Sequence, residues 1–177
     1  MTYSTLIDSM KKLITLLIFI GINFGAIAQH IQVENTAYQL LLKTLLSHSV
    51  PEMSVNELTK KNNTVLLLDA REPKEYQISH LKDAKLVGYE KLDLSSLKNT
   101  PKNQPIVVYC SVGYRSEKVA EKLLQQGFTN VHNLYGGIFE WKNQNQVLVN
   151  EKGITDEVHA YDKTWGIWLK KGKKVYK

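Results

Sequence analysis

The amino-acid sequence predicts an α/β fold with a mainly parallel sheet and helices on both faces of that sheet. Continuous apolar runs, typical of strands buried on both faces, occur at Thr64–Leu68 and Ile106–Tyr109, and Val131–Leu134 is predicted to form a third, short strand. Segments with apolar residues at helical spacing separate these runs. Strands that alternate with helices favour parallel pairing, because each helix then forms the crossover between two strands.

The segment before the first strand is predicted to be helical. Apolar residues recur at helical spacing over Thr36–Leu46. They are Ala37, Leu40, Leu41 and Leu45. Further along, Ser54 followed by Glu57 forms a capping-box pattern, which predicts the start of a second, short helix.

After the first strand we expect a helical turn and a brief strand. The apolar run ends at Asp69, and Pro73 stands where a helix would begin, a position that proline favours. Leu86 and Val87 then indicate a brief strand.

The run Ile106–Tyr109 leads directly into Cys110, and an amphipathic helix is predicted to begin at Ser116. Its apolar face is formed by Val119, Ala120, Leu123 and Leu124. Gly127 is expected to end this helix, and the pair Gly136-Gly137 opens the next one.

The pattern changes beyond Asn145, where short β-like pieces alternate with glycine and lysine. These pieces are Val147–Val149, Val158–Tyr161, Trp165–Leu169 and Val175–Tyr176. They predict a small β extension that packs on the preceding domain. We therefore divide the chain into an N-terminal segment at 1–28, a helical segment at 29–51, the α/β domain at 52–145 and the extension at 146–177.

The composition is that of a globular protein, with 43% hydrophobic and 23% charged residues in a chain of 177. The formal net charge is +6. Its lysines are scattered among acidic residues and asparagines, so a nucleic-acid partner is not expected.

The first 28 residues have the pattern of a secretory signal peptide. Lys11 and Lys12 precede the apolar run Leu13–Ile20, and Ala26-Ile27-Ala28 forms a small-x-small cleavage pattern before Gln29. We therefore expect export to a periplasm or to the outside of the cell, with no membrane span left after cleavage. A retained N-terminal anchor is the alternative.

Cys110 is the one cysteine of the chain. In an oxidising compartment cysteines usually pair, so a lone one is either an inert buried thiol or a reactive one. The residues that follow it are Ser111, Val112, Gly113, Tyr114, Arg115 and Ser116. Open α/β sheets bind ligands beyond the carboxyl ends of their strands, and the amides of a loop that leads into a helix form a cradle for negative charge.

We therefore expect Cys110 to be a nucleophile whose thiolate this cradle stabilises. Gly113 would let the backbone curl without a side-chain clash. Arg115 would close the loop and stabilise an anionic substrate or product.

Several motifs, in order and spacing, resemble the rhodanese homology domain. They are Leu66–Glu72, Glu75-Tyr76, Ser79-His80-Leu81, Val108–Cys110, Arg115-Ser116, Gly127-Phe128, Leu134–Ile138 and Trp141. The resemblance covers the stretch 52–145. It implies a three-layer rhodanese-like fold with a five-stranded sheet, a cysteine that cycles between thiolate and persulfide, and neither a metal nor an organic cofactor.

The resemblance also implies roles for single residues. Cys110 would carry the persulfide, and the amides of Ser111–Ser116 would form the anion cradle, closed by Arg115. Asp69 and Arg71 match the pair at a strand end that braces the active-site loop in the family. Two further residues are interpreted as structural: His80, and Glu75, which is assigned to helix packing or capping.

The predicted function is that of a sulfurtransferase. The donor would be a small sulfur-containing anion such as thiosulfate, or an organic persulfide or thiosulfonate, and the acceptor a thiol, a protein sulfur acceptor or cyanide. Members of the family that use thiosulfate often carry a further basic residue in the loop. Because this loop has Ser111, Val112 and Tyr114 there, a larger organic or protein-borne donor is favoured.

Three other functions compete with sulfur transfer. Phosphatases with a related cysteine loop need five residues between cysteine and arginine, whereas four separate Cys110 from Arg115. A disulfide-handling protein would need a second cysteine. A non-catalytic interaction module with this fold is the remaining alternative, although such a module has no need of the cysteine, glycine and arginine. The polar residues Asp156, Glu157, His159 and Asp162 are interpreted as strand positions rather than as metal ligands.

Overall fold

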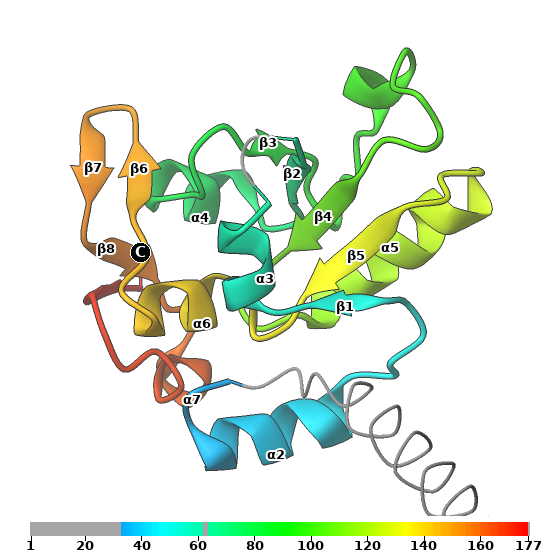
Figure 1. Cartoon of the computed structure of the whole chain (residues 1–177). Helices are drawn as coiled ribbons and strands as arrows, with labels where there is room; N and C mark the ends of the chain where they lie inside the picture. The colour runs from blue at the N-terminus through cyan, green and yellow to red at the C-terminus, as the bar shows by residue number, and fades with distance from the viewer. Residues whose placement is uncertain (1–32, 62–63, 177) are drawn as a thin grey trace, which may run out of the picture. The chain divides into compact units, whose positions relative to one another are not determined.

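The computed structural model describes residues 33–61 and 64–176 (Figure 1). The signal peptide predicted at 1–28 lies outside the described residues. None of the helices within the described ranges combines the length and the hydrophobicity that a membrane span requires.

A five-stranded parallel sheet with the strand order β1-β5-β4-β2-β3 forms the centre of the fold. Its strands are β1 (Glu52–Met53), β2 (Leu66–Asp69), β3 (Lys85–Leu86), β4 (Ile106–Tyr109) and β5 (Val131–Leu134). All four residues of the central strand β4 are buried, which explains its uninterrupted apolar sequence.

Helices cover both faces of the sheet, so the predicted fold class is confirmed (Figure 1). They are α2 (Thr36–Leu45), α3 (Val55–Thr59), α4 (Pro73–Ile78), α5 (Tyr114–Gln125), α6 (Gly137–Asn143) and the short 3-10 helix η1 (Ser95–Leu97). Side chains of β4 alternate between two cores: Ile106 and Val108 pack with α5, and Val107 and Tyr109 pack on the other face.

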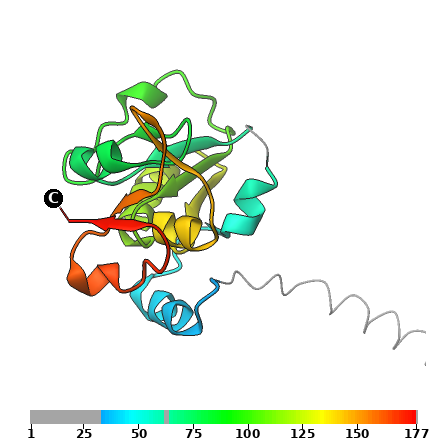
Figure 2. The same ribbon diagram turned by 90° about the vertical axis from the view of Figure 1, so that its left-hand side faces the viewer.

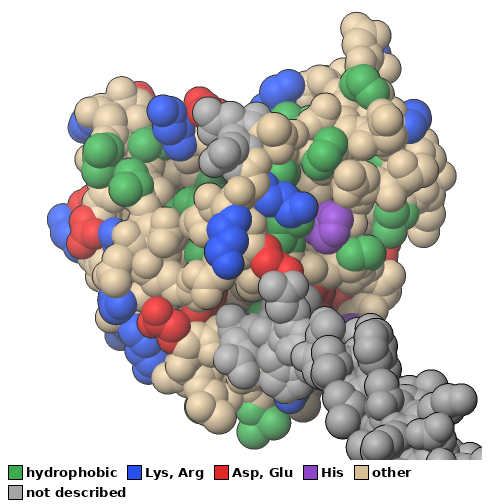
Figure 3. All heavy atoms as spheres, in the orientation of Figure 1, with side chains coloured by type: hydrophobic (Ala, Val, Ile, Leu, Met, Phe, Trp, Pro, Cys, Tyr) green, Lys and Arg blue, Asp and Glu red, His purple; other side chains and the backbone are tan. Residues whose placement is uncertain are grey.

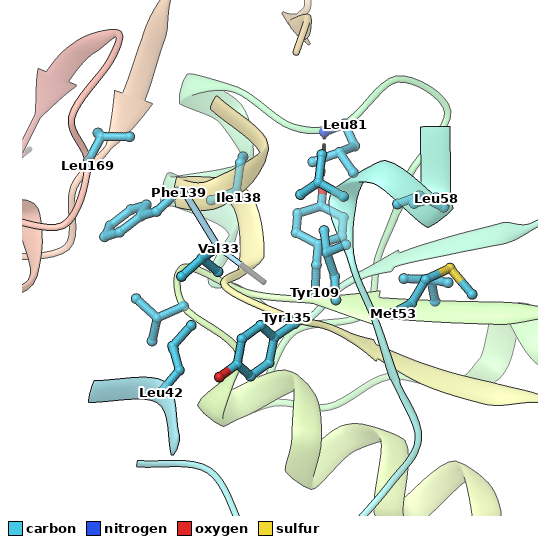
Figure 4. Close-up of a cluster of buried hydrophobic side chains, with 14 of the residues drawn as sticks. Val33, Leu42, Met53, Leu58, Leu81, Tyr109, Tyr135, Ile138, Phe139 and Leu169 are labelled. Carbon is cyan, nitrogen blue, oxygen red and sulfur yellow. Dashed lines mark hydrogen bonds between the residues drawn. The ribbon is translucent and has the colours of Figure 1, made fainter. Parts of the chain in front are cut away.

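The core on the face of the sheet opposite to α5 surrounds Tyr109 (Figure 4). Its ring lies near Leu58 of α3, and its hydroxyl accepts a hydrogen bond of 3.1 Å from the amide of Leu81. A buried tyrosine needs such a partner for its polar end. This contact ties the loop after α4 to the centre of the sheet.

The predicted apolar face of the first helix is partly correct, since Leu41 and Leu45 pack against the core. In α2 the buried residues are Tyr38 and Leu42, whereas Leu40 is 65% exposed. The Tyr38 hydroxyl donates to the carbonyl oxygen of Gly136 at 2.9 Å, and its ring stacks on Trp168 with the ring centroids 5.4 Å apart. The aromatic residue therefore decides which face of the helix is buried.

Two other expectations are settled by local hydrogen bonds. The capping box of Ser54 and Glu57 is confirmed at the start of α3, where both of its hydrogen bonds form. Helix α5 begins at Tyr114, two residues before the predicted Ser116. The chain enters this helix directly from Gly113, whose φ of +123° lies outside the range that other residues favour.

The C-terminal part forms two small strand pairs and a short helix. They are β6 (Leu148–Asn150) with β7 (Gly153–Thr155), β8 (Glu157–His159) with β9 (Lys173–Val175), and α7 (Lys163–Gly166). The predicted strand at Trp165–Leu169 is wrong, because Trp165 and Gly166 form the end of α7 instead. The Asp162 carboxylate caps that helix by accepting a hydrogen bond of 2.9 Å from the amide of Trp165.

This C-terminal part packs on the α/β domain. Val158, Ala160 and Leu169 are completely buried in the same core as Tyr109. The side chain of Asn143 donates to the carbonyl oxygen of Trp168 at 2.9 Å and accepts from the amide of Lys170 at 2.7 Å. Helix α7 lies beside α2 in both views (Figures 1 and 2).

Charged side chains of both signs are interspersed on the face shown in Figure 3. Lysine and arginine form no continuous basic patch on this face, which agrees with the scattered lysines of the sequence.

Candidate active site

Cys110 lies at the base of a cavity of about 610 Å³. The cavity opens beyond the carboxyl ends of β2 and β4, where a parallel sheet is expected to bind its ligands. Cys110 itself is 1% exposed. The loop Ser111–Gly113 and the first turn of α5 surround it.

The carbonyl groups of this loop are held by donors from outside it. The amides of Ile138 and Phe139, at the start of α6, donate to the carbonyl oxygens of Cys110 and Ser111 at 2.9 and 3.1 Å. The Asn133 side-chain amide donates to the carbonyl oxygen of Gly113 at 3.0 Å. With its carbonyls held in this way, the loop turns an amide inward, and the N–H of Gly113 donates to Cys110 Sγ at 3.2 Å.

Helix α6 approaches the loop so closely because its first residue is glycine. Gly137 has a φ of +57°, and a Cβ built on it would overlap the carbonyl oxygen of Cys110 and lie 2.7 Å from that of Ser111. From its sequence context, Gly137 is predicted only to start a helix. Its position against the loop comes from the fold.

Arg115 is fixed by an ion pair with Glu75 of α4. Its two terminal nitrogens donate to the two carboxylate oxygens at 2.7 and 2.8 Å, a bidentate arrangement. One of these nitrogens also donates to the Ser111 hydroxyl at 3.0 Å. Glu75 is 1% exposed, so the guanidinium is anchored to a buried charge.

This ion pair changes the titration of both groups. Burial alone would raise the pKa of Glu75, but the hydrogen bonds and the charge of Arg115 outweigh burial and lower the pKa to about 2. Burial alone would lower the pKa of Arg115, and Glu75 outweighs that effect and raises it. The loop therefore keeps a charged arginine beside Cys110 over the whole range in which proteins are stable.

Acid is expected to destabilise the protein through Glu75. Its pKa of about 2 in the folded protein lies below the ordinary value of 4.5, so the unfolded chain binds the proton first as the pH falls. The resulting stability is fully present above about pH 5 and is lost toward pH 2, a change on the order of 3 kcal/mol. Urea unfolding at a series of pH values measures this loss.

The matched variants for this measurement are Glu75→Gln and Glu90→Gln. Glu90 is an exposed glutamate that lines the same cavity. The acid-dependent loss of stability should shrink in Glu75→Gln and keep its wild-type size in Glu90→Gln. Equal losses in wild type and Glu75→Gln would contradict the assigned ion pair.

Asp69 and Arg71 form a second, fully buried ion pair. Arg71 Nη2 lies 2.6 Å from Asp69 Oδ2, and both side chains are 0% exposed. Arg71 also donates to the carbonyl oxygen of Ser79 at 2.7 Å, just after α4. The pair therefore fixes the two ends of the segment that carries Glu75, and through Glu75 it supports Arg115.

The structure brings most of the predicted site residues together. Cys110, Ser111, Val112, Tyr114 and Arg115 line the cavity, while Gly113 and Ser116 lie beneath it in hydrogen bonds with the loop and Asn133. Asp69 and Arg71 do not line the cavity and reach the site only through the segment that carries Glu75.

Two contributions were missed by the sequence analysis. Glu75 does cap α4, as expected, by accepting from the amide of Glu72 at 3.0 Å, but it also holds Arg115. The C-terminal part supplies His159, Tyr161 and Trp165 to the cavity lining. In the sequence, Glu75 stands two residues after a proline that starts a helix, which indicates a capping role. This position does not predict an ion pair with a residue 40 positions away.

No group of three or more His, Cys, Asp or Glu side chains within the described ranges is arranged to hold a metal ion. Glu157 and His159 lie on β8 as expected, whereas Asp156 precedes that strand and Asp162 caps α7.

Comparisons of the sequence with known proteins agree on one family. A family model described as "Rhodanese-like domain" matches residues 54–144. The "Thiosulfate sulfurtransferase GlpE" of Coxiella burnetii is 33% identical over 98 residues, which cover 55% of this chain and 90% of that protein. The "Sulfurtransferase" of Allochromatium vinosum is 29% identical over 106 residues, covering 60% and 98% of the two chains.

Solved structures show the same fold. The BH2092 protein of Bacillus halodurans superimposes with a TM-score of 0.53 at 26% identity, over 66% of this chain and 86% of that one. A thiosulfate sulfurtransferase from Pseudomonas aeruginosa gives a TM-score of 0.54 at 21% identity, over 64% and 23% of the two chains.

Proposed function

Because the chain belongs to the rhodanese-like domain family, we propose that it is a sulfurtransferase that carries sulfur as a persulfide on Cys110. The observation that carries this proposal is the hydrogen bond from the Gly113 amide to Cys110 Sγ, at the base of a cavity large enough for a small organic molecule. An inert core cysteine would need neither feature.

The proposed reaction has two steps. In the first, the Cys110 thiolate attacks the outer sulfur of the donor, a new S–S bond forms, and the donor's own S–S bond breaks. The electron pair of that bond leaves with the remainder of the donor, as sulfite from thiosulfate or as a sulfinate from a thiosulfonate. In the second step an acceptor thiolate or cyanide attacks the outer sulfur of the persulfide and restores the thiolate.

The residues around Cys110 have separate roles in this proposal. The Gly113 amide and the start of α5 stabilise negative charge on the sulfur. Arg115 lies beside them and is held by Glu75 and Ser111. Its guanidinium is therefore already in position before a donor binds.

The test is the intact mass of the purified protein after incubation with thiosulfate and, separately, with an organic thiosulfonate. We expect a gain of one sulfur, about 32 Da, that disappears on addition of cyanide. A Cys110→Ser control should show no gain. Failure of every donor to add sulfur would reject the enzyme and favour the non-catalytic interaction module.

We also propose that the chain is exported, because of the pattern at 1–28. The same mass spectrum tests this proposal when the full-length gene product is expressed in a secreting host. A mass that corresponds to a chain starting at Gln29 is expected, and a mass that retains the first 28 residues would indicate an anchor.

A further inference from the structure

One wall of the cavity comes from a segment outside the matched family region. The family match ends at residue 144, whereas His159, Tyr161 and Trp165 line the cavity next to Cys110. A substrate in the cavity therefore meets side chains that the matched family region does not supply.

The wall is held by hydrogen bonds on both sides of Tyr161. The amide of Ala160 donates to the carbonyl oxygen of Val175 at 2.8 Å, which ties the segment to β9. The amide of Tyr161 donates to Nδ1 of His159 at 3.2 Å. Asp162 then caps α7 and thereby fixes Trp165. These hydrogen bonds fix the wall in place within the fold.

Tyr161 adopts a backbone conformation that a tyrosine rarely takes. Its φ is +65°, in the left-handed region that favours glycine. Such strain persists only where the surrounding structure imposes it, and it is concentrated at functional sites. The result here is that the Tyr161 ring lies over the guanidinium of Arg115, 5.3 Å from ring centre to Cζ, while the residue stays 50% exposed.

The charges of the cavity disfavour a dianion. Three carboxylates line it, from Glu72, Glu75 and Glu90, against the two cations Lys74 and Arg115. The ionised side chains thus sum to one negative charge before the thiolate is counted. The Arg115 charge is also already matched by Glu75, so it offers a doubly charged donor little unused attraction.

We infer that Tyr161 and Trp165 form the specificity wall of this cavity, and that they select sulfur donors with an aromatic or extended apolar body and at most one negative charge. This inference rests on the proposed sulfur transfer. An aryl thiosulfonate is the simplest donor of this class: its outer sulfur passes to Cys110, and the electron pair of the broken S–S bond leaves with the aryl sulfinate. The aryl body would lie against the exposed ring of Tyr161.

The experiment compares loading rates of Cys110 by mass spectrometry with three donors: benzenethiosulfonate, methanethiosulfonate and thiosulfate. The first two carry the same single charge and differ in their bodies. Each rate is divided by the rate of the same donor with free cysteine, which removes the donor's own reactivity. We expect the wild type to prefer benzenethiosulfonate over methanethiosulfonate by about tenfold, with thiosulfate the slowest.

Three variants test whether the preference for the aryl donor depends on the wall. Tyr161→Ala should reduce the preference for the aryl donor to about twofold or less, and Tyr161→Phe, which keeps the ring, should retain it. Ile167→Ala is the matched control, because Ile167 is 51% exposed in the same segment but does not line the cavity. Its preference should equal that of the wild type. Thermal melting of each variant verifies that it is folded.

The outcomes separate the two proposals. If no donor adds sulfur to the wild type, both the proposed sulfur transfer and the proposed specificity wall are rejected. If the donors load but the aryl preference is missing, or survives in Tyr161→Ala, sulfur transfer stands and the specificity wall is overturned.

Discussion

Replacing Gly137 with alanine is expected to slow sulfur loading of Cys110 by about a hundredfold or more. The new Cβ would overlap backbone atoms of Cys110 and Ser111, which cannot rotate away as a flexible side chain would. The loop must therefore move, and both hydrogen bonds from α6 to its carbonyls lengthen or break. The amide of Gly113 would then no longer be aligned with the sulfur.

A second glycine provides the control for this prediction. Gly127 has a φ of +88°, also in the left-handed region, but a Cβ built on it meets no atom within 4 Å. Gly127→Ala therefore introduces backbone strain without steric overlap, and we expect near wild-type loading. The assigned role of Gly137 would be wrong if the two variants loaded sulfur at the same rate in the mass assay.

Replacing Arg71 with methionine is expected to lower the free energy of unfolding by about 3–5 kcal/mol. The change leaves the Asp69 carboxylate in the core without the guanidinium that lies 2.6 Å from it. It also removes the hydrogen bond to the carbonyl oxygen of Ser79. Urea unfolding monitored by circular dichroism measures the difference from wild type.

An exposed ion pair of similar geometry is the control. Lys173 and Glu157 lie 2.7 Å apart, but the Lys173 side chain is 73% exposed. Lys173→Met should leave the free energy of unfolding close to the wild-type value, because water and salt screen this pair. The double variant Asp69→Leu/Arg71→Met should recover part of the stability lost in Arg71→Met, since it removes the unpaired charge. A loss in Arg71→Met as small as that in Lys173→Met would show that Asp69 finds another partner.

The fold was predictable where burial and sequence pattern coincide. Strand β4 is buried on both faces, so its sequence is wholly apolar, and β5 was predicted with its observed bounds. The buried face of the first helix was predicted only in part, because it is centred on Tyr38, whose hydroxyl reaches Gly136 and whose ring meets Trp168. Those partners lie roughly 100 and 130 residues away and cannot be found from local spacing.

Those parts of the candidate site that are consecutive in the sequence were predictable, whereas its contacts between distant segments were not. The strand, Cys110, the loop and the helix are consecutive, and a general rule of α/β sheets places a site at their junction. The start of α5 was predicted two residues late, because the chain turns at Gly113 and Ser116 is not the cap. The pairing of Arg115 with Glu75 and the wall from Tyr161 depend on contacts that only the folded chain creates.

The burial of Cys110 has a consequence for how the protein withstands oxidation. The chain holds a single cysteine, and its side chain is 1% exposed. A disulfide between two copies would require their Cα atoms to approach to about 4.4–6.8 Å, which the cavity walls prevent while the loop stays folded. In a second copy Cys110 is buried in the same way, so the sulfurs of two folded chains are kept apart, whereas a small molecule that enters the cavity can reach the sulfur. The fold thus separates sulfur loading from covalent dimerisation.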